Sequence, residues 1–590
     1  MNTLRYTLTD YTYKYCSDRP APIAWGQTHI ELLALRNEMA ACQLLLEPAE
    51  TVLATLGRAL HLHWQPGARL RVEVGELRSV EGDVLLGGEV QACFVGTVPV
   101  DGEGTRVADP LLRQESILIP AGRVQAIWLS LRVPKQARPG RYVLPLTLYY
   151  AADDFLDEEI AGQAEVTLEV AALVLPDPAE FRHFLDLWQH PTGIARGHGV
   201  PLWSEEHWRL IEAYGRELAR LGQKAITIIA SDSPWAGQRC RGNPEYPSAL
   251  HEYNMVGISR GRDGKLHFDF SRMDRYVETY LRLGINKEIE VLGLLAAWDD
   301  DFGRPLQDHP DNIRLACRDE ATGRITWLRT QAELREYMGA LAAHLQQRGW
   351  WELTRFTADE PSDVALFRQR VDFLHSACPG AQAKIPFYHT ELMGEFLQDV
   401  ADWVPVLHGL ARDVETSRRL QAAVQARGDR FLWYVCCGPK RPNNFITSPA
   451  IEARFQGWFT AWAGLDGFLR WAFTCWPADP WGQPYYRIPH WPAGDMFFVY
   501  PGGDGQPVRS LRTETLLLGI QDFELVALAR AEAERRPEVR AAIEQAFARI
   551  VRADLAAFAA VNERAAETLY SLAPEDYEAA RRGIIEAMGR

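Results

Sequence analysis

The sequence lacks any long apolar run. No stretch of its 590 residues is both long and apolar enough to span a bilayer, and its start, MNTLRYTLTDYTYKY, has no apolar segment of the length that a secretory signal needs. We therefore expect no membrane association. The sequence as written predicts a cytoplasmic protein, or an exported one whose leader has been removed.

Runs of basic residues are also missing. The chain carries 63 Lys and Arg against 78 Asp and Glu, a net charge of −15, and no long Lys/Arg stretch. A surface of this sign repels phosphate backbones. Nucleic acid is therefore excluded as an expected partner.

Metal and phosphate motifs are absent as well. The nine cysteines are scattered and form no C-x-x-C pair, which indicates reduced, buried thiols in a reducing compartment. His183, His190 and His198 fit no zinc spacing. The glycine-rich stretch 502–505 lacks the Lys-Ser/Thr of a phosphate loop. We expect no metal and no cofactor.

Aromatic residues, in contrast, are abundant, with 19 Trp, 20 Tyr and 23 Phe. Most of them are expected in the core. A tryptophan excess at loop positions is also what a sugar-binding cleft needs, because a pyranose presents an apolar face that stacks on an aromatic ring.

The first 175 residues consist of short β-rich runs separated by turn residues, and no long helical pattern interrupts them. Alternation with a period of two is clear in RLRVEVGEL and AEVTLEVAA. This pattern predicts an antiparallel β-sandwich over residues 1–175. The Pro-rich segment 175–180 then forms a linker.

Strand and helix patterns alternate from residue 181 onward, and this alternation is typical of a (β/α)8 barrel, here over 181–500. An open doubly wound sheet rarely needs eight units and usually shows a glycine-rich first turn, which is absent. A C-terminal helical region follows at 501–590. The predicted strands are 181–188, 225–230, 288–295, 353–360, 382–388, 403–407, 430–437 and 467–476, with helices 204–222, 271–284, 330–349, 361–377, 390–398, 414–428 and 448–464 between them.

Two adjacent carboxylates, Asp359 and Glu360, end the fourth predicted strand, and Pro361 follows them. Barrel enzymes place catalytic groups at such strand ends. Repulsion and burial would raise the pKa of one carboxyl enough for it to act as an acid. The same residues also suit the N-terminus of the next helix, so the dipeptide alone leaves both interpretations open.

Several ordered motifs resemble glycoside hydrolase family 123. They are SDSPW at 231–235, YPS at 246–248, the hairpin DGKLHFD at 263–269, LGI at 283–285, the Asp-Glu-Pro at 359–361 and the segment 494–528. The resemblance covers most of the chain. The loops after the third and eighth strands, however, depart from the pattern of the family.

The resemblance implies a retaining exo-β-N-acetylgalactosaminidase that works by substrate assistance. In such an enzyme Glu360 is the general acid and base, and Asp359 orients the 2-acetamido group of the sugar. The acetamido oxygen then attacks C1 and forms an oxazolinium ion, so no enzyme nucleophile is needed. Because neighbouring strand residues point to opposite faces, both carboxylates reach one pocket only if the chain turns there.

Other candidates follow from their positions near strand ends, and for each a structural role is the alternative. Tyr388 could polarise the acetamido oxygen. Trp298 and Trp476 could pack against the acetamido group. Contacts to sugar hydroxyls are expected from His190, Asp232 and Trp235.

Three other functions stay open. One is a β-N-acetylhexosaminidase that also accepts the gluco epimer, and another is an enzyme that releases oligosaccharides from an internal N-acetylgalactosamine. The third is a glycan-binding protein without activity, since a fold alone does not imply catalysis.

Overall fold

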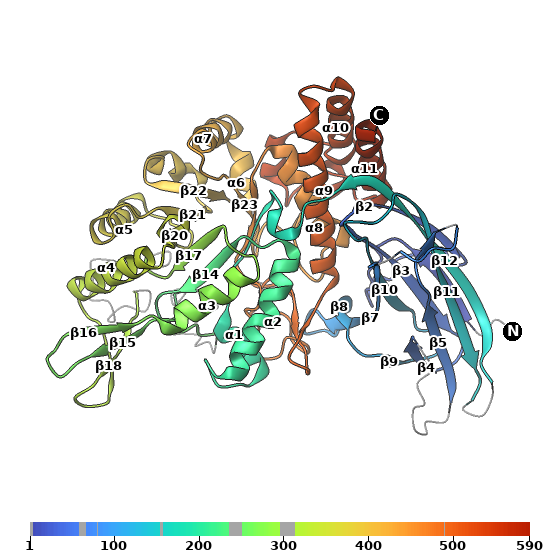
Figure 1. The fold of residues 1–590 in the computed structure, drawn as a ribbon, viewed down its shortest axis with the longest axis horizontal. Coiled ribbons are helices and arrows are strands. Elements are labelled where there is room, and N and C mark those ends of the chain that lie inside the picture. Colours follow the sequence, from blue (N-terminus) through green and yellow to red (C-terminus); the bar gives the residue numbers. More distant parts are fainter. Residues whose placement is uncertain are drawn as a thin grey trace.

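The structure is a computed structural model that describes residues 4–57, 67–79, 81–85, 87–153, 157–234, 250–295, 313–488 and 490–589. A β-rich part, an α/β part and C-terminal helices follow one another along the chain, with helices α8 and α9 in the middle of the molecule (Figure 1). No helix of the described residues is long and apolar enough to cross a membrane.

The N-terminal part contains two sheets. The first has the order β1 (Leu4–Thr9), β3 (Met39–Pro48), β10 (Gln125–Arg132), β7 (Glu89–Pro99) and β8 (Arg106–Leu112). The second has the order β2 (His29–Arg36), β12 (Glu159–Val174), β11 (Gly140–Ala151), β5 (Ala68–Val74), β4 (Val52–Leu56) and β9 (Ser116–Ile119), with the short β6 (Arg78–Ser79) beside β11.

The alternation seen in the sequence buries one face of each sheet. Leu44 and Ile127 of the first sheet share a core with Leu70, Leu144 and Val166 of the second. The prediction of a β-rich N-terminal region is confirmed, but its sheets are not antiparallel throughout. The pairs β2–β12 and β4–β5 are parallel. A short hairpin would force two strands to pair antiparallel, but β2 and β12 lie far apart in the sequence. They can therefore pair in parallel.

Eight parallel strands form the framework of the α/β part. Five pair in the order β14 (Ala225–Ile229), β17 (Glu288–Leu292), β20 (Thr354–Thr357), β21 (Ala383–Phe387) and β22 (Val400–Pro405). Three pair in the order β13 (Phe184–Leu187), β24 (Gly467–Arg470) and β23 (Trp433–Tyr434). Isolated parallel bridges join the two sets at Leu185–Gln223, Trp403–Phe431 and Val406–Tyr434. Each of these strands overlaps one of the eight predicted runs.

Helices follow these strands in the sequence. They are α1 (Pro191–His198), α2 (Glu205–Leu221), α3 (Ser271–Arg282), α4 (Gln331–Gln347), α5 (Val364–Ala377), α6 (Leu407–Arg412), α7 (Val414–Ala426) and α8 (Ala450–Ala463). Local sequence explains their ends. The Ser204 hydroxyl accepts the His207 N–H at the start of α2, and Gly222 ends it at φ 83°. The predicted helix at 390–398 is instead the 3-10 helix Thr390–Phe396, whose sequence includes Gly394, a weak helix former.

A small sheet is inserted beside the α/β part, in the order β16 (Leu266–Asp269), β15 (Gly257–Arg260), β18 (Ala316–Asp319) and β19 (Ile325–Trp327). The DGKLHFD motif lies in the β15–β16 hairpin, with Gly264 at φ 81° in its turn.

The C-terminal part contains α9 (Leu511–Ala533), α10 (Pro537–Ile550) and α11 (Pro574–Gly589), preceded by the short strands β25 (Tyr500–Pro501) and β26 (Pro507–Val508). This agrees with the predicted helical region. Helix α9 packs closely on α8, since a Cβ atom on Gly457 would lie 1.8 Å from the Gly519 carbonyl oxygen. The exact domain boundaries at 175, 181 and 500 stay predictions.

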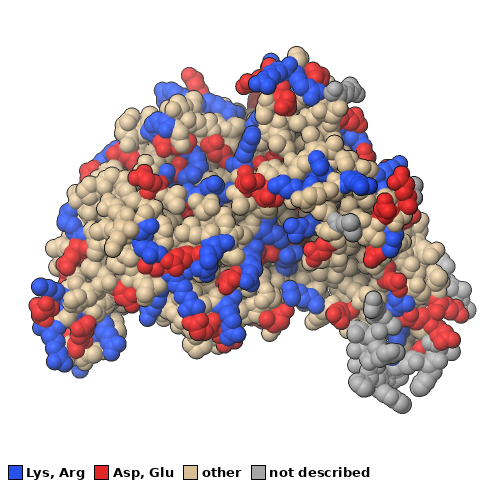
Figure 2. Space-filling model, in the orientation of Figure 1, with Lys and Arg blue, Asp and Glu red and all other residues tan. Residues whose placement is uncertain are grey.

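Buried ion pairs connect α9 to the other parts of the molecule. Arg512 binds Asp109 of β8 at 2.9 Å, and Asp522 binds Arg454 of α8 at 2.6 Å. On the face shown in Figure 2, basic and acidic residues are interspersed around a local gathering of basic side chains near the middle.

Candidate active site

A pocket of about 410 Å³ lies where the carboxyl ends of five parallel strands meet. Trp188 directly follows β13, Asp359 and Glu360 follow β20, and Tyr388 follows β21. Tyr434 ends β23, and Trp471 follows β24. Ser362, Pro386, His389, Cys436, Cys437, Leu469 and Trp491 complete the described lining. Ligand sites of α/β proteins favour this end of a parallel sheet.

Asp359 and Glu360 both line this pocket. Strand β20 ends at Thr357, and the chain bends at Asp359, which is 8% exposed. The Asp359 Oδ1 accepts the backbone N–H of Glu360 at 3.2 Å. The expectation that the chain turns here is confirmed, and the turn places two adjacent carboxylates at the same pocket.

The environment of Glu360 favours its protonated form. Burial raises the pKa of Glu360, although a hydrogen bond from Tyr434 and the nearby His389 act in the opposite direction. The Tyr434 hydroxyl donates to Oε1 of Glu360. Burial and the Glu360 charge raise the pKa of Tyr434 well above its usual value, so its hydroxyl remains a donor. A raised pKa is what a carboxyl needs to act as a proton donor.

The rest of the pocket is largely aromatic. Trp188, Trp471 and Trp491 contribute indole rings, and Tyr388 and Tyr434 contribute phenol rings. A pocket with apolar walls and a few polar groups suits a pyranose, which has an apolar face and polar edges.

Tyr388 was predicted from its strand-end position, and the structure places it in the pocket. The side chain is 43% exposed, and its ring contacts those of His408 at 5.2 Å and His389 at 5.4 Å. Its hydroxyl has no hydrogen-bond partner among the described residues. This hydroxyl is therefore available to a ligand.

Three other predicted residues do not line the described pocket. His190 is fully buried, and its ring contacts Trp471 edge-on at 6.3 Å. Asp232 is buried and accepts the backbone N–H groups of Asn254 at 3.1 Å and Ala316 at 2.8 Å, so it ties two loops together. Trp476 is 1% exposed.

The environment of Trp476 is that of a core residue. Its indole N–H donates to the Val499 carbonyl at 2.7 Å, and its ring packs against Tyr214 and His198. The structure brings Trp471 to the pocket in its place. Trp235 and Trp298, the two remaining predicted contacts, lie outside the described residues.

Trp471 is held by a buried ion pair. Arg470 and Asp495 lie 2.6 Å apart, and both are fully buried. Burial raises the pKa of Asp495 to about 6, while Arg470 and a hydrogen bond from Trp471 lower it. Trp471 therefore hydrogen-bonds to a buried carboxyl that is itself paired with Arg470.

The structure does not gather His183, His190 and His198 into a possible metal site. Burial lowers the pKa of His183 to about 3, and its ring packs on Phe523. The His198 Nε2 atom lies 2.8 Å from the Tyr214 hydroxyl oxygen.

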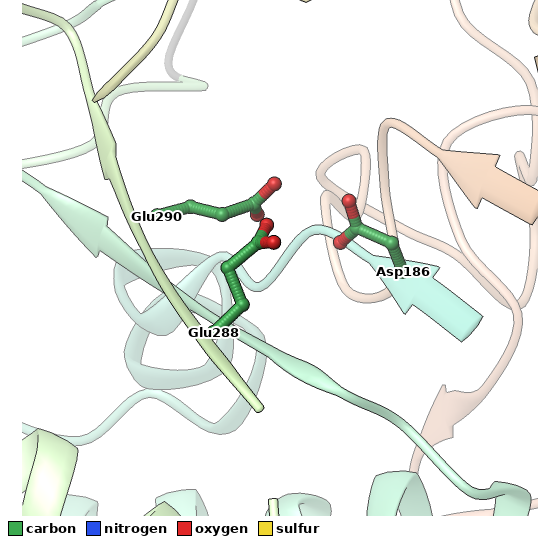
Figure 3. Close-up of side chains that lie close together, drawn as sticks. All are labelled: Asp186, Glu288 and Glu290. Atoms are coloured by element: carbon green, nitrogen blue, oxygen red, sulfur yellow. The ribbon is translucent and has the colours of Figure 1, made fainter. Parts of the chain in front are cut away.

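One acidic cluster among the described residues has the geometry of a cation site, and it consists of Asp186, Glu288 and Glu290 (Figure 3). The three carboxylates point toward one another from β13 and β17. The buried ammonium group of Lys384 already lies among them, 2.9 Å from Glu288 and 2.8 Å from Glu290, and it also binds Asp186. The place of a metal ion is therefore taken by a side chain of the protein.

Sequence reasoning missed Trp188, Tyr434, Cys436, Cys437, Trp471 and Trp491. A rule that inspects every strand end would have found Trp188, because it is the last residue of the predicted strand 181–188. Trp471 was missed because strand β24 ends at Arg470, whereas the apolar run continues to residue 476.

Comparisons with known proteins indicate the family of the chain. Residues 188–529 match the family model described as glycoside hydrolase 123, catalytic domain. A solved structure of a family 123 glycoside hydrolase from Clostridium perfringens, reported for glycolipid glycan hydrolysis, aligns with a TM-score of 0.77 at 18% identity. This alignment covers 100% of this chain and 99% of that one.

A putative β-galactosidase from Bacteroides fragilis aligns with a TM-score of only 0.26 at 10% identity, over 75% of this chain and 54% of that one, which is too low to support an argument. A comparison with curated proteins gave no match. The family match spans more than half of the chain and includes both carboxylates of the pocket. The chain belongs to glycoside hydrolase family 123.

Proposed function

We propose that the chain is a retaining, exo-acting β-N-acetylgalactosaminidase that hydrolyses terminal β-linked N-acetylgalactosamine with the help of the substrate's own acetamido group. The observation that carries the proposal is that Asp359 and Glu360 are the only carboxylates among the described residues of the pocket. Conventional retaining glycosidases place two carboxylates ~5–5.5 Å apart across the scissile bond, with one as the nucleophile. Adjacent carboxylates fit a mechanism in which the substrate supplies the nucleophile.

In the first step Glu360 donates its proton to the glycosidic oxygen while the bond between that oxygen and C1 breaks. The acetamido carbonyl oxygen attacks C1 from the opposite face and forms the oxazolinium ion. Asp359 accepts a hydrogen bond from the acetamido N–H, which orients the amide and stabilises the positive charge that develops on it. The raised pKa of Glu360 supports its role as the proton donor.

In the second step the Glu360 carboxylate removes a proton from water, and the resulting hydroxide attacks C1 as the oxazolinium ring opens. Two inversions at C1 give net retention. We assign to the Tyr388 hydroxyl a hydrogen bond to the acetamido oxygen, on the basis of its position in the pocket and its lack of a partner among the described residues.

We further propose that the eight parallel strands form a closed (β/α)8 barrel. The bridges between Leu185 and Gln223 and between Trp403 and Phe431 support closure, because they connect both ends of the five-stranded set to the three-stranded set. A closed ring would explain why side chains that follow five different strands meet at one pocket.

The test is hydrolysis of nitrophenyl β-N-acetylgalactosaminide and β-N-acetylglucosaminide, side by side, with an NMR measurement of the anomer formed first. We expect turnover of the galacto substrate with the β-anomer as first product. Equal turnover of both epimers would support a broader β-N-acetylhexosaminidase. Release of an oligosaccharide from an internal position would support the endo alternative, and binding without turnover would support a glycan-binding protein.

A further inference from the structure

Two further cavities lie next to the pocket, and we call the three together the groove. A second cavity, of about 520 Å³, shares Cys437 with the pocket. A third, of about 370 Å³, shares Thr447, Ser448 and Pro449 with the second. Because neighbouring cavities share wall residues, the three are adjacent, and they lead from the carboxylates to residues of the β-rich part such as Val107.

The wall shared by the pocket and the second cavity lies near Glu360, because Cys437, burial and the charge of Glu360 all raise the pKa of the neighbouring Cys436 thiol. Tyr434, which donates to Glu360, is two residues before Cys436 and three before Cys437, which forms the shared wall. A general acid lies beside the leaving-group oxygen, because it protonates that atom. A cavity that adjoins the pocket beside the general acid is therefore placed to receive the leaving group.

Two parts of the chain form the walls of the groove. One is the loop between β23 and α8, which covers residues 435–449, and the other includes Lys14 near the N-terminus. The Lys14 ammonium group donates to the Ser448 carbonyl at 3.0 Å and so joins the two walls. The groove is thus a built feature, with a side-chain contact between distant segments.

The middle cavity has an excess of positive charge. Lys440 is exposed and Arg441 is half-buried, and neither side chain has an ion pair with a carboxylate among the described residues. One acidic residue, Glu452, also lines this cavity, and it attracts Arg441. The carboxylate of Glu452 is buried, and it already accepts the Asn443 N–H at 3.0 Å and the Tyr570 hydroxyl at 2.9 Å.

The outer cavity, in contrast, carries charges of both signs, with Lys14 and Arg19 against Asp18 and Asp101. Arg19 and Asp18 lie 3.7 Å apart. The unbalanced positive charge is therefore concentrated in the middle cavity, next to the pocket, and it lies on a chain whose net charge is −15.

We propose that the middle cavity is a leaving-group subsite for acidic glycans, in which Lys440 and Arg441 bind a carboxylate or sulfate group carried by the glycan beyond the scissile bond. This inference rests on the proposed function, because only a glycosidase that cleaves at Glu360 places its leaving group there. Arg and Lys are the side chains that proteins use to bind such anions, and Arg binds them with two parallel hydrogen bonds.

The experiment compares three oligosaccharides that end in the same β-linked N-acetylgalactosamine. One is neutral, one carries a carboxylate on its penultimate sugar, and one carries a sulfate there. We expect kcat/KM for at least one acidic substrate to exceed that for the neutral one by about tenfold at low ionic strength, and we expect the advantage to shrink in 0.3 M NaCl. Comparison of kcat/KM for the two acidic substrates distinguishes a site for carboxylate from a site for sulfate.

The double variant Lys440→Gln/Arg441→Gln should reduce the ratio of acidic to neutral kcat/KM to about one. The matched control is Arg262→Gln/Lys265→Gln in the turn between β15 and β16, which removes two exposed cations outside the cavities described and should keep the wild-type ratio. Thermal unfolding of both variants checks that they fold.

A wild-type ratio of one or less for both acidic substrates would overturn the inference, as would a double variant that folds and keeps the full advantage. These outcomes differ from failure of the proposed function, in which the nitrophenyl N-acetylgalactosaminide and all three oligosaccharides stay intact.

Discussion

The Tyr434 hydroxyl donates a hydrogen bond to Oε1 of Glu360, although the two residues are 74 positions apart in the sequence. The contact joins the loop after β20 to the end of β23. It also lowers the pKa of Glu360 against the opposing effect of burial. A residue from another strand therefore adjusts the pKa of the carboxyl that donates the proton in the proposed mechanism.

Replacing Tyr434 with Phe should move the pH profile. Loss of the hydrogen bond removes a group that stabilises the Glu360 carboxylate, so the pKa of Glu360 rises further. The alkaline limb of kcat/KM against pH, which reports loss of the proton from the acid, should shift to higher pH. A pH titration of kcat/KM for both proteins measures this, and a shift to lower pH would contradict the assignment.

Replacing either carboxylate should reduce activity strongly. Asp359→Asn and Glu360→Gln should each decrease kcat by ~10²–10⁴. The control is Asp363→Asn, because Asp363 caps α5 by accepting the Leu366 N–H at 2.7 Å and Asn caps equally well. Near-normal kcat in both site variants would remove these residues from the mechanism.

Glu360→Gln should be partly rescued by a better leaving group. A dinitrophenyl leaving group departs without protonation, so the rate of the first step should depend less on the acid. Asp359→Asn should not be rescued in this way, because its defect lies in orienting the acetamido group. Equal rescue of both variants would show that the two roles are not separated as proposed.

The two tryptophans near β24 should respond differently to substitution. Trp471→Ala should raise KM by about tenfold, because it removes a pocket wall against which the sugar stacks. Trp476→Ala should lower the free energy of unfolding by ~3–5 kcal/mol, because it empties a core position. Denaturant unfolding and steady-state kinetics of both variants test this contrast.

Lys384→Met should destabilise the fold by ~3–5 kcal/mol, because it leaves Asp186 and Glu290 buried without their cation and leaves Glu288 with Arg430 alone. Burial and Asp186 already raise the pKa of Glu290, and Lys384 opposes them. Without Lys384 the folded state should bind protons more strongly than the unfolded state. The deficit relative to wild type should therefore shrink as the pH falls from 7 to 5.

Urea unfolding at pH 5, 6 and 7 measures this dependence for Lys384→Met. The exposed Lys265→Gln serves as the control and should change stability by less than ~0.5 kcal/mol at each pH. A deficit for Lys384→Met that grows toward pH 5 would mean that the lysine does not neutralise the carboxylates as described.

The sequence predicted the parallel strands well because apolar runs of four to eight residues between helical patterns are a strong signal. The expectation that Asp359, Glu360 and Tyr388 lie at strand ends agrees with the structure, in which they follow β20 and β21 closely and line one pocket, while their roles stay predictions. Strand ends were harder to predict. The apolar run after residue 467 does not show that β24 stops at Arg470, so Trp476 was chosen over Trp471.

Long-range contacts escaped prediction for a different reason. No local pattern links Tyr434 to Glu360, or Lys384 to acidic residues on β13 and β17. These contacts depend on how strands that are distant in the sequence come together. Local propensity and periodicity carry no information about them.

The central claim is that the acetamido group of the substrate is the nucleophile at Asp359 and Glu360. The most direct measurement is kcat/KM for nitrophenyl β-N-acetylgalactosaminides whose acetyl group carries zero, one, two or three fluorine atoms. Fluorine withdraws electrons from the carbonyl oxygen and weakens its attack on C1. We predict that kcat/KM falls steeply with each fluorine, and a series with the same kcat/KM throughout would contradict the account.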